Sequence, residues 1–264
     1  MTIISAFGET ICISVSGAIG ELRLNRPTVR NALNNDLIKA VTEAVQWFND
    51  QSEIKVVIFS GEGKSFCSGF DLAQFSEKND TEAVRNTIDS GGKLINAIVS
   101  MRPVTIAAVH SHCIGGGVLI AMACDFRYVS NCATFKLPET DIGIPLAWGG
   151  VPLLTREMGP LLATDFILTC RELTASEALA YRMINRVINL DALSSNTMDL
   201  AKRLANHSSL VLEITKSQLK AARIDICSDA GSFSEAHLVH SALLDEKSKK
   251  VRSDYIKKIS KNNQ

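Results

Sequence analysis

Three consecutive glycines, at positions 115–117, could present backbone amides to a reacting molecule. They lie between two apolar runs, so the pattern predicts that a buried strand ends there and a buried helix begins. The first amides of a helix have no carbonyl partner within it, and the helix dipole adds partial positive charge to them. Such a junction favours an anion or a carbonyl oxygen that gains negative charge. The alternative explanation for the glycines is close packing of the helix.

A second segment could supply a converging amide. SFCSGFDL, at 65–72, also follows a predicted buried strand, contains a glycine and would present the amide of Phe70. Two amides from separate loops form an oxyanion hole, and loss of one such donor typically costs about 3 kcal/mol of transition-state stabilisation. The two segments together indicate an enzyme that stabilises negative charge on a carbonyl oxygen.

Nucleotide-binding and metal-binding motifs are absent from the sequence. The GKS at 63–65 lacks the earlier glycine of a P-loop, because position 58 is Ile, and the residues after Gly117 do not complete a G-x-G-x-x-G fingerprint. The seven cysteines are scattered without a CxxC pair, and no carboxylate stands at ligand spacing beside the histidines. We therefore expect no metal and no nicotinamide cofactor.

Composition limits the partners of the chain. Its 264 residues include 28 basic and 28 acidic side chains, and this balance argues against nucleic-acid binding through bulk charge. No apolar run approaches the roughly 18 residues that cross a bilayer, and the N-terminus has no basic region followed by an apolar run, as a signal peptide would. We expect a soluble, cytoplasmic protein with no membrane partner.

Hydrophobic periodicity predicts the elements that hold the two loops. Residues 10–27 alternate as two strands around a Gly-centred turn do, and Pro27 ends this stretch. Residues 34–50 have one apolar helical face after an asparagine cap. Further buried strands are expected at 55–63, 103–109, 126–130 and 133–137, and a buried helix at 117–126. From Gly159 onward the pattern is helical, with a capping box between Thr174 and Glu177. Strands first and helices last indicate an α/β core.

Five segments, taken in order, resemble the motifs of the enoyl-CoA hydratase/isomerase (crotonase) superfamily. SFCSGFDL is similar to its first oxyanion-hole loop, and IGGGVLIAMACDFR, at 114–127, to its second. The other three are LNRPTVRNALN at 24–34, FKLPETDIGI at 135–144 and LTASEALAYRMINRVI at 173–188. The match covers roughly residues 10–190, and five motifs in order are far more specific than any one of them.

The resemblance implies both a fold and a substrate. The fold would be a crotonase-like spiral of ββα units in residues 1–191, with a helical C-terminal trimerisation region in residues 192–264. The resemblance further implies a homotrimer or a dimer of trimers that binds an acyl-CoA thioester in a bent conformation. Coenzyme A would enter as part of the substrate, so no separate cofactor is expected.

The resemblance also assigns roles to residues of the two loops. The amides of Phe70 and Gly116 would contact the thioester oxygen. The adenine and pantetheine parts of CoA would be held by two segments, which contribute Arg30, Ala32, Leu33, Ser68, Gly69, Asp71 and Leu72. For Arg30 the alternative is an ordinary solvated surface arginine.

One departure from the family pattern narrows the chemistry. Hydratases of this family use two glutamates, one after the proline of the P-E element and one two residues after the third glycine. Glu139 occupies the first position here, but Leu119 occupies the second. A leucine can neither hold nor deprotonate water, so the usual hydration route should be impaired. A double-bond shift needs only one base, and Glu139 beside an apolar wall would suit it because burial raises a carboxyl pKa toward neutral pH.

The leading hypothesis is therefore a 3-enoyl-CoA to 2-enoyl-CoA isomerase with Glu139 as base. The alternatives are a hydratase with a non-standard water-holding group such as His112, and a non-catalytic acyl-CoA binding protein. Dienoyl-CoA isomerases and aryl-CoA dehalogenases of the family carry an aspartate where this chain has Ala147, so neither reaction is favoured. Trp148 stands where the family commonly has a small residue, and it would either narrow the pocket or pack in the core.

Overall fold

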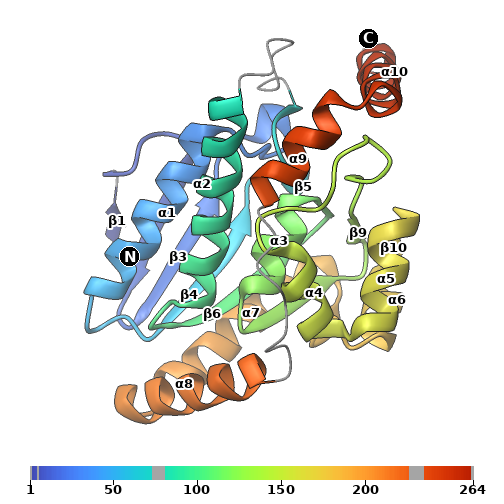
Figure 1. Cartoon of the computed structure of the whole chain (residues 1–264). Helices are drawn as coiled ribbons and strands as arrows, with labels where there is room; N and C mark the ends of the chain where they lie inside the picture. The colour runs from blue at the N-terminus through green and yellow to red at the C-terminus, as the bar shows by residue number, and fades with distance from the viewer. Residues whose placement is uncertain (1, 5, 73–80, 226–234, 263–264) are drawn as a thin grey trace.

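A seven-stranded sheet runs through the centre of the protein (Figure 1). The computed structural model describes residues 2–4, 6–72, 81–225 and 235–262. The strand order is β1-β2-β3-β4-β6-β8-β11, with antiparallel pairing from β1 to β3 and parallel pairing from β3 onward. The strands are Thr2–Ile4 (β1), Ile11–Ser16 (β2), Ile19–Leu24 (β3), Val56–Gly61 (β4), Val104–Val109 (β6), Phe126–Ser130 (β8) and Arg186–Ile188 (β11).

A smaller sheet of four strands carries the loops of interest. Its order is β10-β9-β7-β5, and its strands are Ser65–Cys67 (β5), His112–Ile114 (β7), Thr134–Lys136 (β9) and Leu173–Thr174 (β10). β5, β7 and β9 are parallel to one another, and each directly follows a strand of the large sheet in the chain. A helix then follows each pair, giving β4-β5-α2, β6-β7-α3 and β8-β9-α4. This repetition confirms the predicted spiral of ββα units.

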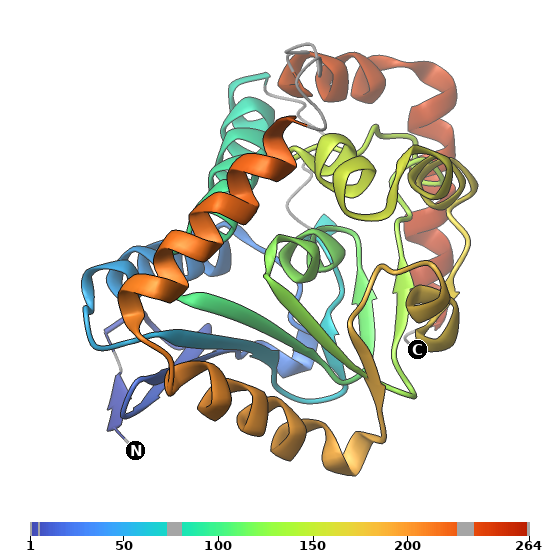
Figure 2. The same cartoon turned by 90° about the horizontal axis from the view of Figure 1, so that it is seen from below.

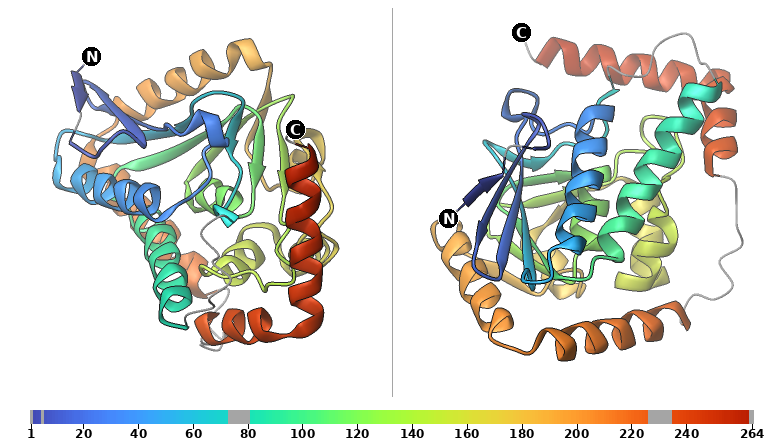
Figure 3. Two further views of the ribbon diagram at one scale, coloured as in Figure 1. Left: turned by 90° about the horizontal axis from the view of Figure 1, so that it is seen from above. Right: turned by 90° about the vertical axis from the view of Figure 1, so that its left-hand side faces the viewer.

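Helices cover both faces of the large sheet, as its parallel strands require. On one face lie α1 (Asn35–Asp50), α2 (Thr81–Val99) and α3 (Gly116–Ala123), with α1 and α2 packed side by side (Figure 3). α3 is buried along its whole length, as its all-round apolar sequence predicts. The opposite face is covered by α7 (Leu190–Ala205), whose Leu193, Leu200 and Ala201 pack against β3, β4, β6 and β8 (Figure 2).

The remaining helices pack mainly against other helices or against strands of the small sheet. They are α4 (Gly150–Met158), α5 (Pro160–Thr169), α6 (Ala175–Ala180), α8 (Ser209–Asp225), α9 (Glu235–Leu244) and α10 (Glu246–Asn262), together with the short 3-10 helix Pro27–Val29. α9 packs against α2 and α10 against α9. None of the helices in the described ranges is both long and apolar enough to cross a membrane. The division of the chain at residues 191/192, and the role of the region after it in trimer formation, stay predictions.

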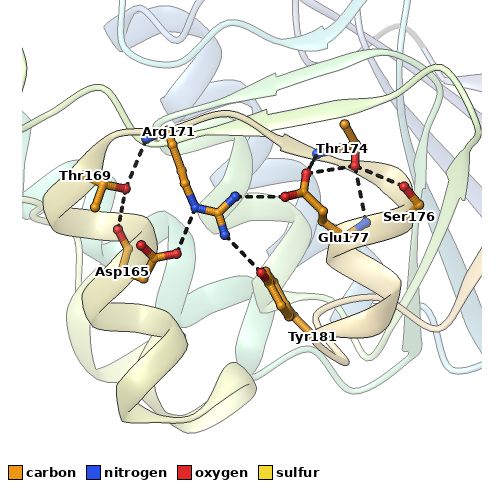
Figure 4. A network of polar contacts seen from close by, with 7 residues as sticks. All are labelled: Asp165, Thr169, Arg171, Thr174, Ser176, Glu177 and Tyr181. Carbon is orange, nitrogen blue, oxygen red and sulfur yellow. Dashed lines mark hydrogen bonds and ion pairs between the residues drawn. The ribbon is translucent and has the colours of Figure 1, made fainter.

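Local sequence signals agree with the structure at both predicted caps. The side chain of Asn34 accepts a hydrogen bond from the Leu37 amide at the start of α1. Thr174 and Glu177 form the predicted capping box of α6, which continues into an ion-pair network around Arg171 (Figure 4).

Several elements differ from the sequence prediction. Helical structure begins at Gly150, not Gly159, and β10 and β11 interrupt the stretch where only a helical pattern was expected. These strands have two and three residues, too few to show a period of two. α2 was not predicted at all, because its adjacent glycines Gly91 and Gly92 weaken the helical signal.

Candidate active site

The two glycine-containing loops meet at one edge of the small sheet. β5 and β7 are parallel neighbours, so the loop after β5 and the start of α3 after β7 leave the sheet at the same end. Gly69 and Gly115 have positive φ angles of 88° and 53°, which glycine adopts without strain. A Cβ placed on either glycine would lie 3.6 Å from the Cα of the other. The structure therefore brings the two predicted amide-bearing loops into contact.

The N–H of Gly116 lies at the start of a buried helix. Gly115 is the N-cap of α3, and its own N–H donates to the carbonyl of Lys136 on β9 at 2.8 Å. Gly116 is the first residue of α3, so its N–H has no carbonyl partner within that helix. Gly116 and Phe70 both line one pocket, as the oxyanion-hole prediction requires.

The segment around Leu33 fixes the position of the Phe70 loop. The Leu33 N–H donates to the Gly69 carbonyl at 2.8 Å, and the Asp71 N–H donates to the Leu33 carbonyl at 3.1 Å. Leu33 and Phe70 thus form an isolated parallel bridge. The predicted segments 30–33 and 68–72 lie side by side as a result.

The pocket beside these loops has a volume of about 460 Å³, part of which is open to solvent. Most of its wall is apolar and comes from α2, α3, α9 and the loop before α4. The lining residues are Phe70, Thr87, Ile88, Gly116, Leu119, Glu139, Ile144, Pro145, Leu146, Ala147, Trp148 and Val239. Within that set, Glu139 is the one titratable side chain.

Glu139 presents a carboxyl group to the junction of the two glycine loops. Its Oε1 lies 2.8 Å from the position that a Cβ on Gly115 would occupy. The residue is half-buried as a whole, but Oε2 is enclosed and has no hydrogen-bond partner among the described residues. Burial raises the pKa of Glu139 to about 7, against a smaller lowering effect of its own backbone N–H. A carboxyl with this pKa can take up and release a proton near neutral pH.

Leu119 forms part of the apolar wall of the same pocket. It lies on α3, where its N–H donates to the Gly115 carbonyl at 3.3 Å, and its side chain is 2 % exposed. The second carboxylate of a two-glutamate site would come from this position, and the structure has a buried leucine there. No other described carboxylate lines the pocket.

Several residues predicted to hold CoA have other contacts. Asp71 forms an ion pair with Nη1 of Arg26 at 3.2 Å, and the same nitrogen donates to the Ala32 carbonyl at 2.5 Å. Ala32 and Leu33 are buried, whereas Arg30 is exposed. The Ser68 N–H donates to the Arg30 carbonyl at 3.0 Å.

The remaining predicted residues divide between the pocket and the surface. Leu72 is half-buried beside Asp71, and Trp148 is buried and lines the pocket. His112, the alternative water-holding group, is exposed, and its ring Nδ1 lies 3.1 Å from Oγ1 of Thr134. It does not line the pocket, so the geometry gives no support to that role.

Comparison with known proteins places the chain in one family. The profile of the enoyl-CoA hydratase/isomerase family matches residues 14–262. The chain belongs to this family. A short-chain-enoyl-CoA hydratase of Clostridium acetobutylicum is 30% identical over 230 residues, which cover 86% of this chain and 88% of that protein. A peroxisomal Delta(3,5)-Delta(2,4)-dienoyl-CoA isomerase of Arabidopsis thaliana is 33% identical over 227 residues, which cover 81% of this chain and 82% of that protein.

The fold of the enoyl-CoA hydratase/isomerase family is equally clear in solved structures. The crystal structure of an enoyl-CoA hydratase from Mycobacterium avium subsp. paratuberculosis superposes with a TM-score of 0.84 at 24% identity. The match covers 93% of this chain and 98% of that one. Membership of the family makes this chain an acyl-CoA enzyme, and relatives with hydratase names and with isomerase names both match it.

Sequence reasoning missed several contributors to the site of this family member, including Ile144, Pro145 and Leu146 of the loop before α4. Thr87 and Ile88 reach the pocket from α2, which was not predicted, and Val239 reaches it from α9, far along the chain. Arg26 was also missed as the partner of Asp71. Arg26 lies in the motif LNRPTVRNALN, but nothing in that motif indicates that Asp71 is its partner.

Proposed function

We propose that this enzyme converts a 3-enoyl-CoA into a 2-enoyl-CoA, with Glu139 as the single base and acid. The observation that carries the proposal is the surroundings of Glu139. Its carboxyl group is enclosed beside the glycine loops, has a pKa raised to about 7 by burial, and shares its pocket with the apolar side chain of Leu119.

The proposed reaction moves one proton and no other atom. The Glu139 carboxylate takes a proton from the carbon next to the thioester carbonyl, and the electron pair passes to the thioester oxygen. The amides of Phe70 and Gly116 stabilise the resulting dienolate, because donors already in place lower the energy of the developing charge. Protonated Glu139 then returns a proton to C4, which leaves the double bond between C2 and C3. The transfer needs neither water nor a cofactor beyond the CoA of the substrate.

The proposal also assigns the binding of CoA to the paired segments 30–33 and 68–72. Their mutual hydrogen bonds and the Arg26–Asp71 ion pair hold the Phe70 amide in place. Asp71, through its ion pair with Arg26, also supports the geometry of the loop that would hold CoA. The assembly into a homotrimer or dimer of trimers, and a cytoplasmic location, stay predictions.

A hydratase is the main rival, and a protein that binds acyl-CoA without converting it is the second. The names of matching relatives favour hydration at least as much as isomerisation. The residues of this chain favour isomerisation, because the pocket offers one carboxyl group where water addition by the usual route uses two.

An assay with two substrates separates the three functions. We expect the enzyme to convert 3-hexenoyl-CoA into 2-hexenoyl-CoA and to form little 3-hydroxyhexanoyl-CoA from 2-hexenoyl-CoA, as measured by liquid chromatography of the products. Comparable formation of the hydroxy product would identify a hydratase. Tight binding of both thioesters without conversion of either would identify a binding protein.

Substitution at Leu119 tests why hydration is disfavoured. Leu119→Glu supplies the missing carboxyl group and should increase the rate of hydration of 2-hexenoyl-CoA by about tenfold or more, since positioned acid–base groups typically contribute 10²–10⁴-fold. Leu119→Gln is the matched control, because it has nearly the same size and polarity but cannot exchange a proton in this way. Equal hydration by both variants would contradict the argument.

A further inference from the structure

The backbone of Trp148 has an unusual conformation. Its φ is +61°, in the left-handed region that bulky side chains rarely adopt, and the residue is 6 % exposed. Gly149 and Gly150 follow, so the chain turns sharply into α4 directly after the tryptophan. Such a conformation persists only where the surroundings hold it. The backbone of Trp148 is therefore held in place by the residues around it.

Two glycines leave the space that this ring fills. A Cβ on Gly91, in the middle of α2, would lie 1.9 Å from Cε2 of Trp148, and a Cβ on Gly116 would lie 2.5 Å from Cζ3. Neither position can carry a side chain unless the ring moves. A glycine inside a helix is unfavourable by itself, so Gly91 has a packing reason to be there. A Cβ placed in the same way on the neighbouring Gly92 would have no atom within 4 Å.

The ring borders the reacting end of the pocket. It packs edge-to-face against Phe70, with ring centroids 6.2 Å apart and an interplanar angle of 88°. It also contacts Gly116, whose amide is the second oxyanion donor of the proposed function. The rest of the pocket wall is largely apolar and includes Ile88 and Leu119.

Trp148 thus fills a gap between α2 and α3, which pack against each other and both contribute residues to the pocket wall; we call this ring the plug. With the indole removed, the backbone at Gly91 and Gly116 would face across an empty space that joins the pocket, since neither glycine has a side chain to fill it. We propose that Trp148 is the specificity-determining residue that closes this space and restricts the enzyme to short acyl chains. The inference rests on the proposed site for the thioester, but it concerns binding and does not depend on which reaction follows.

The affinity for saturated acyl-CoAs tests the plug without any turnover. Isothermal titration with butanoyl-CoA, hexanoyl-CoA, octanoyl-CoA and decanoyl-CoA should show weakening affinity of the natural enzyme for the longer chains. In Trp148→Ala the ratio of decanoyl-CoA to butanoyl-CoA affinity should rise by about tenfold or more, because the added methylenes become buried. An unchanged ratio would show that the ring only fills the core, and would overturn the proposal.

Variants at the two adjacent glycines supply the matched control. Gly91→Ala forces the ring from its place and should change the chain-length profile, whereas Gly92→Ala meets open space and should leave the profile as it is. Equal effects of the two substitutions would contradict the plug. If Trp148→Ala does not fold, Trp148→Gly removes the same ring and suits the left-handed backbone, so the ratio can be measured in that variant.

Tryptophan fluorescence gives a second readout. The chain has two tryptophans, and Trp47→Phe leaves Trp148 as the single emitter. Titration with hexanoyl-CoA should shift its emission, whereas CoA without an acyl group should not. No shift with hexanoyl-CoA would place the acyl chain away from the ring and would reject the proposal. A changed chain-length profile without conversion of any 3-enoyl-CoA would instead reject the proposed function and leave the plug in place.

Discussion

Glu139 and Glu157 both hold carboxyl groups inside the protein, and their surroundings are opposite. Glu157, on α4, has a side chain that is 7% exposed, and it pairs with Nη2 of Arg127 at 3.3 Å and Nε of Arg156 at 3.4 Å. Glu139 has no ion pair among the described contacts, and its Oε2 has no hydrogen-bond partner there. Burying a charge is costly unless a partner compensates it, so the two sites use their carboxyl groups differently.

The paired carboxyl group contributes to the framework of the site. Arg127, its partner, also donates from Nη1 to the carbonyls of Met122 at 3.2 Å and Cys124 at 2.8 Å, at the end of α3. Those carbonyls carry the negative end of the helix dipole, whose positive end is at Gly116. Glu157 thus fixes the position of Arg127, which in turn bonds to the end of α3. Glu139 has no such ion pair, so its carboxyl group is available to exchange a proton.

The largest expected effect comes from removing the unpaired carboxyl group. Glu139→Gln should lower the turnover of 3-hexenoyl-CoA by 10² to 10⁴-fold, roughly the usual contribution of a positioned acid–base group. Affinity for hexanoyl-CoA should change little, because the amide has nearly the same size. Steady-state kinetics with titration calorimetry measures both quantities. Turnover that survives in Glu139→Gln would mean that another group is the base.

The second effect concerns stability and the paired carboxyl group. Glu157→Gln leaves Arg127 buried without its counter-charge, and removal of one partner of a buried ion pair typically costs about 3–5 kcal/mol. Urea unfolding of the purified variant should therefore show a lower midpoint than that of the natural enzyme. The folded fraction should keep the chain-length profile of the natural enzyme. If the variant is as stable as the natural protein, then the ion pair of Glu157 does not stabilise the fold and the argument is wrong.

The identity of the unpaired carboxyl group could be predicted from the sequence, but its packing could not. The order of the motifs identified Glu139, Phe70, Gly116 and Leu119, because a short motif fixes the local turn and the side chain that it carries. All four line the pocket. The ion pair of Arg26 with Asp71 joins residues that are 45 positions apart, and no local pattern indicates such a partner.

Among the helices, those that show their burial in their own residues were predicted, and one that depends on a distant contact was missed. The strongly amphipathic α1 and the uniformly apolar α3 were predicted, because each helix shows its burial in its own residues. α2 was missed because Gly91 weakens the helical pattern, and the sequence alone does not show that Trp148 packs against it. The site residues that came from α2 were missed for that reason.

A rise in pH should affect turnover and stability in opposite directions through Glu139. The folded pKa of about 7 lies above the ordinary value of 4.5, so the folded state holds a proton between these values that the unfolded state has lost. Stability should therefore fall as the pH rises through that window, by roughly 3 kcal/mol in total. Turnover should rise over the upper part of the same window, as the carboxylate forms.

Glu139→Gln provides the control, since an amide does not ionise. Urea unfolding between pH 5 and 8 should show a pH-dependent loss of stability in the natural enzyme that is smaller in the variant, which should be the more stable of the two at pH 8. This is opposite in sign to the effect of Glu157→Gln. Parallel pH curves for the natural enzyme and Glu139→Gln would show that the carboxyl group is not isolated from water or from a partner.

The smallest effect is expected at Glu177, a partly exposed glutamate that is neither in a buried ion pair nor in the pocket. Hydrogen bonds from the Thr174 backbone, then from the Thr174 hydroxyl and Arg171, lower its pKa, so its contribution is present at neutral pH and is lost as the pH falls below the ordinary range (Figure 4). Thr174→Ala removes the hydroxyl that caps α6 and should cost about 1 kcal/mol, without a change in turnover. Glu177→Gln keeps the capping geometry but not the charge, and should cost less than either change at Glu157 or Thr174. Thermal unfolding should show a difference between Glu177→Gln and the natural enzyme at pH 7 but not at pH 3. A difference in stability that persists at pH 3 would mean that the substitution had disturbed the capping geometry and not only removed the charge.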